Sequence, residues 1–230
     1  MGRASGAVQV YRNRRPALRR LQLICFAVRR GTSEIRPQSP VAGQNEIVRR
    51  LRDFPCGAAV KSEAQLEAAL DCPPGVVFVL RGDGLEIGSM LRRIHAAGKL
   101  AAVHLDLVDG LSSDISGVRW LVRSGADAII SSHSQAVRAV KAEGVTAIQR
   151  VLCLSELSVE HGMTAVSRGQ PDIVELLPGV ILPQVADLVL PGLAVPLLAG
   201  GFIRSAKDVE AVLEAGALAV TTTDATLWNL

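Results

Sequence analysis

The chain has 230 residues, of which 49% are hydrophobic and 3% aromatic, and its formal net charge is +3. This apolar content is enough for one substantial core, and it fits one large α/β domain better than two domains. No apolar run approaches the roughly 18 residues that a membrane span needs, and segment 21–28 lacks a signal-peptide cleavage pattern, so we expect a cytoplasmic protein without a membrane partner.

Residues 1–45 differ from the rest of the chain in charge. They hold nine arginines and one acid, Glu34, whereas the remainder carries more acids than bases. Such an arm can be an electrostatic handle for nucleic acid or a membrane, or a tail without structure. We therefore expect a basic, disordered extension at 1–45 and one folded domain at 46–230.

Short apolar runs alternate with amphipathic stretches from residue 57 onwards. The runs predict strands at 58–61, 76–80, 101–107, 128–131, 147–151, 173–177, 197–199 and 218–221. The stretches predict helices at 63–70, 86–97, 115–123, 134–143, 155–167, 182–189 and 206–214, with a lead-in helix at 46–54 and a short one near Leu227. Glycines follow four of these helices, where a left-handed residue ends a helix. Eight such units predict an α/β barrel of the (β/α)8, triosephosphate-isomerase type, with an open doubly wound sheet as the alternative.

A glycine pair follows the seventh predicted strand, and three threonines surround the end of the eighth. Because Gly200 and Gly201 carry no side chain, their backbone N–H groups can approach an anion closely, and the hydroxyls of Thr222 and Thr223 stand after the next strand. In eight-fold barrels the loops after strands seven and eight build a phosphate site. The pattern therefore predicts that these four residues bind a small phosphate.

Polar residues also occur at the carboxyl ends of other predicted strands, where barrel sites lie. These residues are Lys61, Arg81, Gln149, Arg150 and Glu175. His104 and Asp106 are two apart in the third predicted strand, so they should point the same way. Such groups can bind a phosphorylated or hydroxylated ligand, or pair Lys61 or Arg150 with Asp106 or Glu175 in an internal ion-pair ring.

Signals for metals and for covalent chemistry are weak. The four cysteines, at 25, 56, 72 and 153, lack CxxC spacing, which argues against a disulfide framework or a zinc site. Tight metal-ligand clusters are missing, and Lys61 is the only lysine on a predicted strand. We therefore expect no metal, no cofactor and no catalytic residue.

Five segments in order resemble the glycerol-uptake-operon antiterminator family: HLDLVDGLSSD, ADAIISS, TAIQRVLCL, PDIVELLPGVI and PLLAGGFIRSAKDVEAVLEAGALAVTTTDATLW, at 104–114, 126–132, 146–154, 171–181 and 196–228. The resemblance covers about residues 54–230. It implies a barrel without catalytic activity that binds glycerol 3-phosphate as effector and acts on the leader mRNA of a glycerol operon, so that transcription passes a terminator.

The resemblance also implies roles for individual residues. Gly200, Gly201, Thr222 and Thr223 would hold the phosphate, and Gly179 would lie beside it. Asp106, Arg150 and Glu175 would face the glycerol end. Where we expect the first strand of the family to carry an arginine, this chain has Lys61, which keeps the cation but loses the bidentate fork.

Three functions stay open at this point. The first is a glycerol-3-phosphate-sensing regulator that binds RNA, although the acidic body is awkward for that partner. The second is a barrel enzyme, an isomerase or lyase on a small phosphorylated substrate, which fold alone cannot exclude. The third is a sensor that signals through a protein partner. Homo-oligomer formation is left open.

Overall fold

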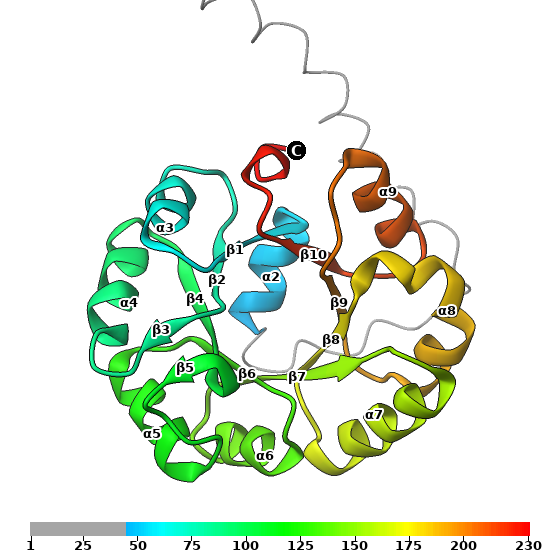
Figure 1. Ribbon diagram of the computed structural model, residues 1–230, viewed down its shortest axis with the longest axis horizontal. Helices are drawn as coiled ribbons and strands as arrows, with labels where there is room; N and C mark the ends of the chain where they lie inside the picture. The colour runs from blue at the N-terminus through cyan, green and yellow to red at the C-terminus, as the bar shows by residue number, and fades with distance from the viewer. Residues whose placement is uncertain (1–44) are drawn as a thin grey trace, which may run out of the picture. The chain divides into compact units, whose positions relative to one another are not determined.

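Eight parallel strands close into a barrel, in the order β1, β2, β4, β6, β7, β8, β9 and β10 around the ring (Figure 1). The computed structural model describes residues 45–230, so the extension predicted for 1–45 lies outside the described residues except at its last position. The strands are β1 (Cys56–Val60), β2 (Val76–Val79), β4 (Leu100–His104), β6 (Ala128–Ser131), β7 (Thr146–Leu152), β8 (Ile173–Leu177), β9 (Leu197–Gly200) and β10 (Ala219–Thr222). The predicted barrel is confirmed, and the open sheet is wrong.

Helices follow the strands in chain order and surround the ring (Figure 1), except the first of them, which precedes β1 and lies across the end of the ring. They are α2 (Glu46–Asp53), α3 (Glu63–Leu70), α4 (Ile87–Ala96), α5 (Ile115–Ser124), α6 (Ser134–Ala142), α7 (Glu156–Gly169), α8 (Leu182–Val189) and α9 (Ala206–Glu214). Short 3-10 turns are η3 (Leu105–Leu107), η4 (Gly179–Ile181), η5 (Leu190–Gly192) and η6 (Ala225–Leu227).

Hydroxyl and carboxylate side chains fix where several helices begin. Asp114 accepts hydrogen bonds from the amides of Ser116 and Gly117 at the start of α5, and Ser205 accepts one from the Asp208 amide at the start of α9. These contacts satisfy amides that have no partner inside the helix. Ser205 thus marks the start of α9. At the other end of α5, Gly125 has a φ of 101°, which favours glycine.

The structure differs from the prediction after the third strand of the ring. β4 ends at His104, and residues 105–107 form η3 instead of continuing the strand. Two short strands that were not predicted, β3 (Gly82–Asp83) and β5 (Val108–Asp109), then pair beside the barrel. Asp106 therefore lies on a turn outside β4. The prediction that it belongs to the third strand is wrong, and strand alternation does not relate its direction to that of His104.

Alternate residues of each strand fill the barrel interior. The buried cluster there includes Ala59, Ala102, Ile148, Ile173, Leu198 and Ala219, one from each of six strands. Because side chains alternate along a strand, the residue two positions further on faces the same interior one layer closer to the carboxyl ends. Those residues are Lys61, His104, Arg150, Glu175, Gly200 and Thr221.

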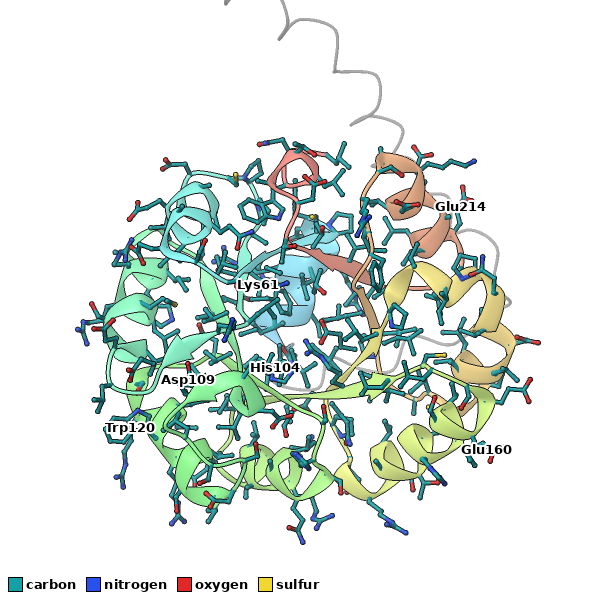
Figure 2. The ribbon with its side chains drawn as sticks, in the orientation of Figure 1. Lys61, His104, Asp109, Trp120, Glu160 and Glu214 are labelled. Atoms are coloured by element: carbon teal, nitrogen blue, oxygen red, sulfur yellow. The ribbon has the colours of Figure 1, made fainter. Side chains whose placement is uncertain are left out.

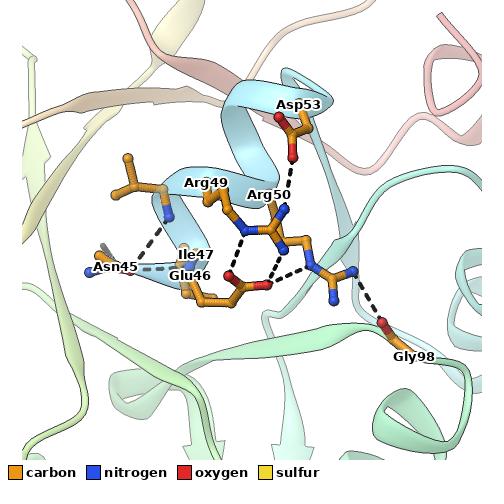
Figure 3. Close-up of polar contacts among 8 residues, drawn as sticks. Asn45, Glu46, Ile47, Arg49, Arg50, Asp53 and Gly98 are labelled. Atoms are coloured by element: carbon orange, nitrogen blue, oxygen red, sulfur yellow. Dashed lines mark hydrogen bonds and ion pairs between the residues drawn. The ribbon is translucent and has the colours of Figure 1, made fainter. Parts of the chain in front are cut away.

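Helix α2 covers the amino-terminal end of the barrel. Its buried Ile47 and Leu51 belong to the interior cluster, and Arg50 Nη1 donates to Gly98 O at 3.2 Å, just before β4 (Figure 3). Glu46 accepts from Arg49 at 2.5 Å and from Arg50 at 2.9 Å, and these hydrogen bonds lower the pKa of Glu46 to about 2. A ligand of the barrel interior would therefore enter from the carboxyl ends of the strands.

Candidate functional site

Polar side chains from several strands meet in the barrel interior near the carboxyl ends. Figure 2 shows Lys61 and His104 toward the middle of the ring, while Trp120, Glu160 and Glu214 lie on its outside. Arg150 and Glu175, two of the polar residues noted at strand ends, are among these groups, and their side chains are 11% and 1% exposed.

A buried network joins Arg150, Glu175 and Thr221. Arg150 donates from Nε at 2.9 Å and from Nη2 at 2.8 Å to Glu175 Oε2, and Thr221 Oγ1 donates to Glu175 Oε1 at 2.9 Å. Every oxygen of this carboxylate therefore has a partner, as a buried charge requires. The internal ion pair expected between Arg150 and Glu175 is confirmed.

Gly200 makes this network possible, since it lies on β9 between Glu175 on β8 and Thr221 on β10. A β-carbon at Gly200 would lie 2.4 Å from Thr221 Oγ1 and 2.9 Å from Glu175 Oε1. The hydroxyl thus reaches across β9 only because position 200 has no side chain. Thr221 was missed by the sequence analysis, although strand alternation from the buried Ala219 would have pointed to it.

His104 is buried beside this network and is 2% exposed. Neither ring nitrogen has a hydrogen-bond partner within residues 45–230. Burial, with a further contribution from the Arg150 charge, lowers the pKa of His104 to about 4. The imidazole is therefore neutral at pH 7, with one nitrogen that donates and one that accepts.

Asp106 ties the turn after β4 to the end of β6. Its carboxylate accepts from Ser113 Oγ at 2.8 Å, Ser131 Oγ at 2.7 Å and the Ser132 amide at 2.7 Å. Burial alone would raise the pKa of Asp106, but these hydrogen bonds outweigh it and hold that pKa below its usual value. The geometry gives Asp106 a role in shaping the rim.

The turn after β9 and the end of β10 form one continuous rim. Thr221 pairs with Gly200 in the sheet, and Thr222 Oγ1 donates to Ile203 O at 3.0 Å while it accepts from the Asp224 amide at 3.1 Å. Gly201 and Phe202 have φ values of 86° and 58°. A left-handed backbone is strained for phenylalanine, and such strained residues are common at binding sites. The Phe202 side chain is 65% exposed.

Two further predicted residues lie on the same rim. Gly179 packs directly on β9, where an added β-carbon would lie 2.5 Å from the Gly200 amide nitrogen. Thr223 O accepts from Gln65 Nε2 at 3.3 Å, while its half-buried hydroxyl makes no hydrogen bond within residues 45–230. The structure therefore brings all five residues predicted around the phosphate to neighbouring strand ends.

Lys61, by contrast, lies apart from the Arg150–Glu175 pair. It lines a cavity of about 290 Å³ at the ends of β1 and β2, together with Arg81, Asp83, Glu86 and Asp109. It forms no ion pair in the described part of the chain, so its predicted pairing with Asp106 or Glu175 is wrong.

Gln149 also differs from expectation, because a β-carbon at Gly169 of α7 would meet its Oε1 at 2.3 Å. It thus points toward the helices and away from the barrel axis.

Other chemical groups are sparse in the described region. Residues 45–230 hold no group of three or more side chains that could bind a metal ion, and none of their helices is long and apolar enough to cross a membrane. Cys56, Cys72 and Cys153 are free thiols, and burial raises the pKa of Cys56 to about 12. Cys25 lies outside the described residues.

Residues 57–228 match the family described as glycerol-3-phosphate responsive antiterminator. An uncharacterized Escherichia coli K12 protein, YgcP, is 33% identical over 185 residues, which cover 80% of this chain and 96% of that protein.

Solved structures agree with this match. The glycerol uptake operon antiterminator regulatory protein of Listeria monocytogenes is 30% identical, with a TM-score of 0.73 over 76% of this chain and 95% of that chain. A glycerol uptake operon antiterminator-related protein of Thermotoga maritima is 27% identical, with a TM-score of 0.67 over 75% and 96%. Aldolases with 12 to 16% identity and TM-scores of 0.54 to 0.58 share the fold alone.

Proposed function

The chain belongs to the glycerol-3-phosphate responsive antiterminator family, and on this premise we propose that it senses glycerol 3-phosphate at the carboxyl-terminal mouth of its barrel. In the liganded state it acts on the leader mRNA of a glycerol-utilisation operon, so that transcription passes a terminator. The observation that carries the proposal is the shared rim of β9 and β10, which lies beside the buried Arg150–Glu175–Thr221 network and the unpartnered ring of His104.

The phosphate would bind on the rim formed by Gly200, Gly201, Thr222 and Thr223. Support comes from the turn at Gly201, whose φ of 86° is a left-handed backbone conformation that glycine adopts most readily and that can aim successive backbone amides at one anion. The space beside the two glycines is itself filled by Thr221, Glu175 and Leu177. The register of Thr221 with Gly200 keeps both loops within reach of one anion. The Thr223 hydroxyl is available to donate to a phosphate oxygen, whereas the Thr222 hydroxyl orients the rim through Ile203 O.

The glycerol end would point inward to His104 and Arg150. Each hydroxyl of glycerol 3-phosphate both donates and accepts a hydrogen bond, and a neutral imidazole offers one group of each kind. Nε and Nη2 of Arg150 donate hydrogen bonds to Glu175, so Nη1 is free to donate to the ligand. Glu175 would position Arg150, and Asp106 would position the loop after β6.

The barrel-enzyme alternative has less support in the geometry. A general base works best with a pKa near the operating pH, but the pKa of His104 is about 4. The carboxylates of Asp106 and Glu175 are occupied by serine, arginine and threonine donors. These groups suit recognition of a ligand better than proton transfer.

Calorimetry tests the effector site. Glycerol 3-phosphate should bind with one site per chain, and glycerol should bind far more weakly. Thr223→Val keeps the shape of the side chain but removes the donor, and we expect about a tenfold loss of affinity, since one hydrogen bond to a charged group is worth at least about 1.5 kcal/mol. Thr226→Val is the matched control, because its exposed hydroxyl bonds to Asp224. Equal losses of affinity in the two variants would show that the Thr223 hydroxyl does not contact the phosphate.

A gel-shift titration tests the output. The full chain is titrated into a transcript of the leader of a glycerol-uptake operon from the same genome, with and without glycerol 3-phosphate. The effector should tighten binding at least several-fold. Turnover of glycerol 3-phosphate in place of an RNA response would favour the enzyme alternative.

A further inference from the structure

The helices around the barrel differ sharply in charge. α5 and α6 carry Arg119, Arg123, Arg138 and Lys141 and no acid between their ends. On α3 the only charged residues are Glu63 and Glu67, and α9 carries three acids against one lysine. All four cations of α5 and α6 are exposed, so one side of an otherwise acidic body is basic.

Part of this positive charge is not neutralised by the protein. Arg119 pairs with Glu143 at 2.8 Å and Lys141 with Asp172 at 2.5 Å. Arg123 forms no ion pair within the described chain, and Arg138 donates only to a backbone carbonyl, Arg168 O, at 3.1 Å.

A fifth cation extends the basic region onto α4. Arg92 is exposed and likewise has no acidic partner among residues 45–230. A β-carbon at Gly88 would lie 3.6 Å from Arg92 Nη1 and 3.8 Å from Ser124 Cβ, which places this guanidinium beside α5. Three guanidiniums on adjacent helices are therefore available to anions.

An anchored tryptophan lies among these cations. Trp120 on α5 is 45% exposed, and its Nε1 donates to Gly84 O at 2.7 Å, which fixes the indole. Figure 2 shows Trp120 on the outside of the ring, on the side opposite Glu214 of α9. An aromatic ring held beside arginines is the combination that single-stranded nucleic acids use, with bases stacked on the ring and phosphates on the cations.

We propose that the outer surface of α4, α5 and α6, defined by Arg92, Trp120, Arg123 and Arg138 and here called the α5 face, binds single-stranded RNA. This inference rests on the proposed function for the choice of RNA as partner, and it assigns the contact to the side of the barrel, away from the effector mouth. RNA and glycerol 3-phosphate would then occupy the protein together. The excess of acid on α9, which lies across the ring from α5 in Figure 1, would repel the same strand.

Binding of the leader transcript by the full chain, measured against salt, tests the assignment. Arg123→Gln with Arg138→Gln should weaken binding at least tenfold at 0.1 M salt and lower the slope of log affinity against log salt by about 1.4, since each phosphate contact on a single strand contributes roughly 0.7 to that slope. Lys207→Gln with Arg52→Gln removes two exposed cations elsewhere and should stay within about twofold of wild type. All variants should bind glycerol 3-phosphate like wild type.

Fluorescence gives an independent readout. Trp120 is exposed, whereas Trp228 is fully buried, so RNA stacked on the α5 face should quench the emission of Trp120. The quench should vanish in Trp120→Phe, which leaves Trp228 as the remaining fluorophore.

The outcomes separate the two proposals. If wild type binds RNA and the Arg123/Arg138 variant keeps its affinity and salt slope, the assignment of RNA binding to the α5 face is wrong and the proposed function stands. If wild type binds glycerol 3-phosphate but no leader RNA at low salt, the proposed function itself fails. Loss of self-association in the arginine variant without any change in RNA binding would assign the face to a second copy of the chain and also overturn the proposal.

Discussion

Gly200→Ala tests whether the missing side chain at this position is what allows Thr221 to reach Glu175. The new β-carbon would lie 2.4 Å from Thr221 Oγ1 and 2.9 Å from Glu175 Oε1, both far inside normal contact, so the threonine must turn away. The buried carboxylate then loses a hydrogen bond worth about 1.5–3 kcal/mol, and the overpacking costs about 1–3 kcal/mol more. We expect the free energy of unfolding to fall by about 3–5 kcal/mol and the Tm to fall by roughly 6–20 °C.

Urea denaturation followed by the fluorescence of buried Trp228 measures this loss. Gly88→Ala is the control, because its β-carbon meets nothing closer than 3.6 Å and alanine suits a helix better by about 0.5–1 kcal/mol. In a Thr221→Ala background, Gly200→Ala should cost at least about 1 kcal/mol less than in wild type, since the clashing hydroxyl is gone. Additive losses, or a Gly200→Ala protein as stable as wild type, would refute the reasoning.

Three further predictions concern the same interior and its rim. The pKa of His104 is about 4 in the fold against 6.5 when exposed, so stability should be full above pH 6.5 and fall by on the order of 3 kcal/mol as the pH drops to 4; in His104→Phe, urea titrations across this range should show a flatter profile, and an unchanged slope would contradict the assignment. Arg150→Met leaves the Glu175 charge buried without its cation and should cost about 3–5 kcal/mol, whereas the Arg150→Met/Glu175→Gln double variant should recover at least half of that loss. Phe202→Gly relieves a left-handed backbone and should raise the unfolding free energy by up to about 1 kcal/mol; a loss of stability in thermal melts would show that the Phe202 ring contributes packing that outweighs the strain.

The fold could be predicted from the sequence because its signals are local and repeated. Ser205 before α9 and the apolar runs of β8 and β9 each specify an element without help from distant residues. The exception was the turn after His104. Its sequence, LDLVD, is as apolar as a strand, and the hydrogen bonds that hold Asp106 come from Ser113, Ser131 and Ser132, whose proximity only the folded chain reveals.

The site was predicted in part for a related reason. Glycine pairs and threonines after strands seven and eight are visible in the sequence, and so are Arg150 and Glu175 as polar residues at strand ends. Which threonine points inward depends on which alternate residues of β10 face the barrel interior. In the structure Thr221 faces inward and bonds to Glu175, and Thr222 does not. Lys61 directly follows its strand as expected, yet it lines a cavity with Arg81 at the ends of β1 and β2 and forms no ion pair with Glu175. The sequence alone did not show which of these neighbours it would have.

A crystal structure of the full chain with glycerol 3-phosphate is the most direct measurement of the effector site. We predict phosphate oxygens within hydrogen-bond distance of the Gly201 backbone and the Thr223 hydroxyl, with a glycerol hydroxyl against His104. A phosphate bound between Lys61 and Arg81 instead, with the β9–β10 rim unoccupied, would contradict the account.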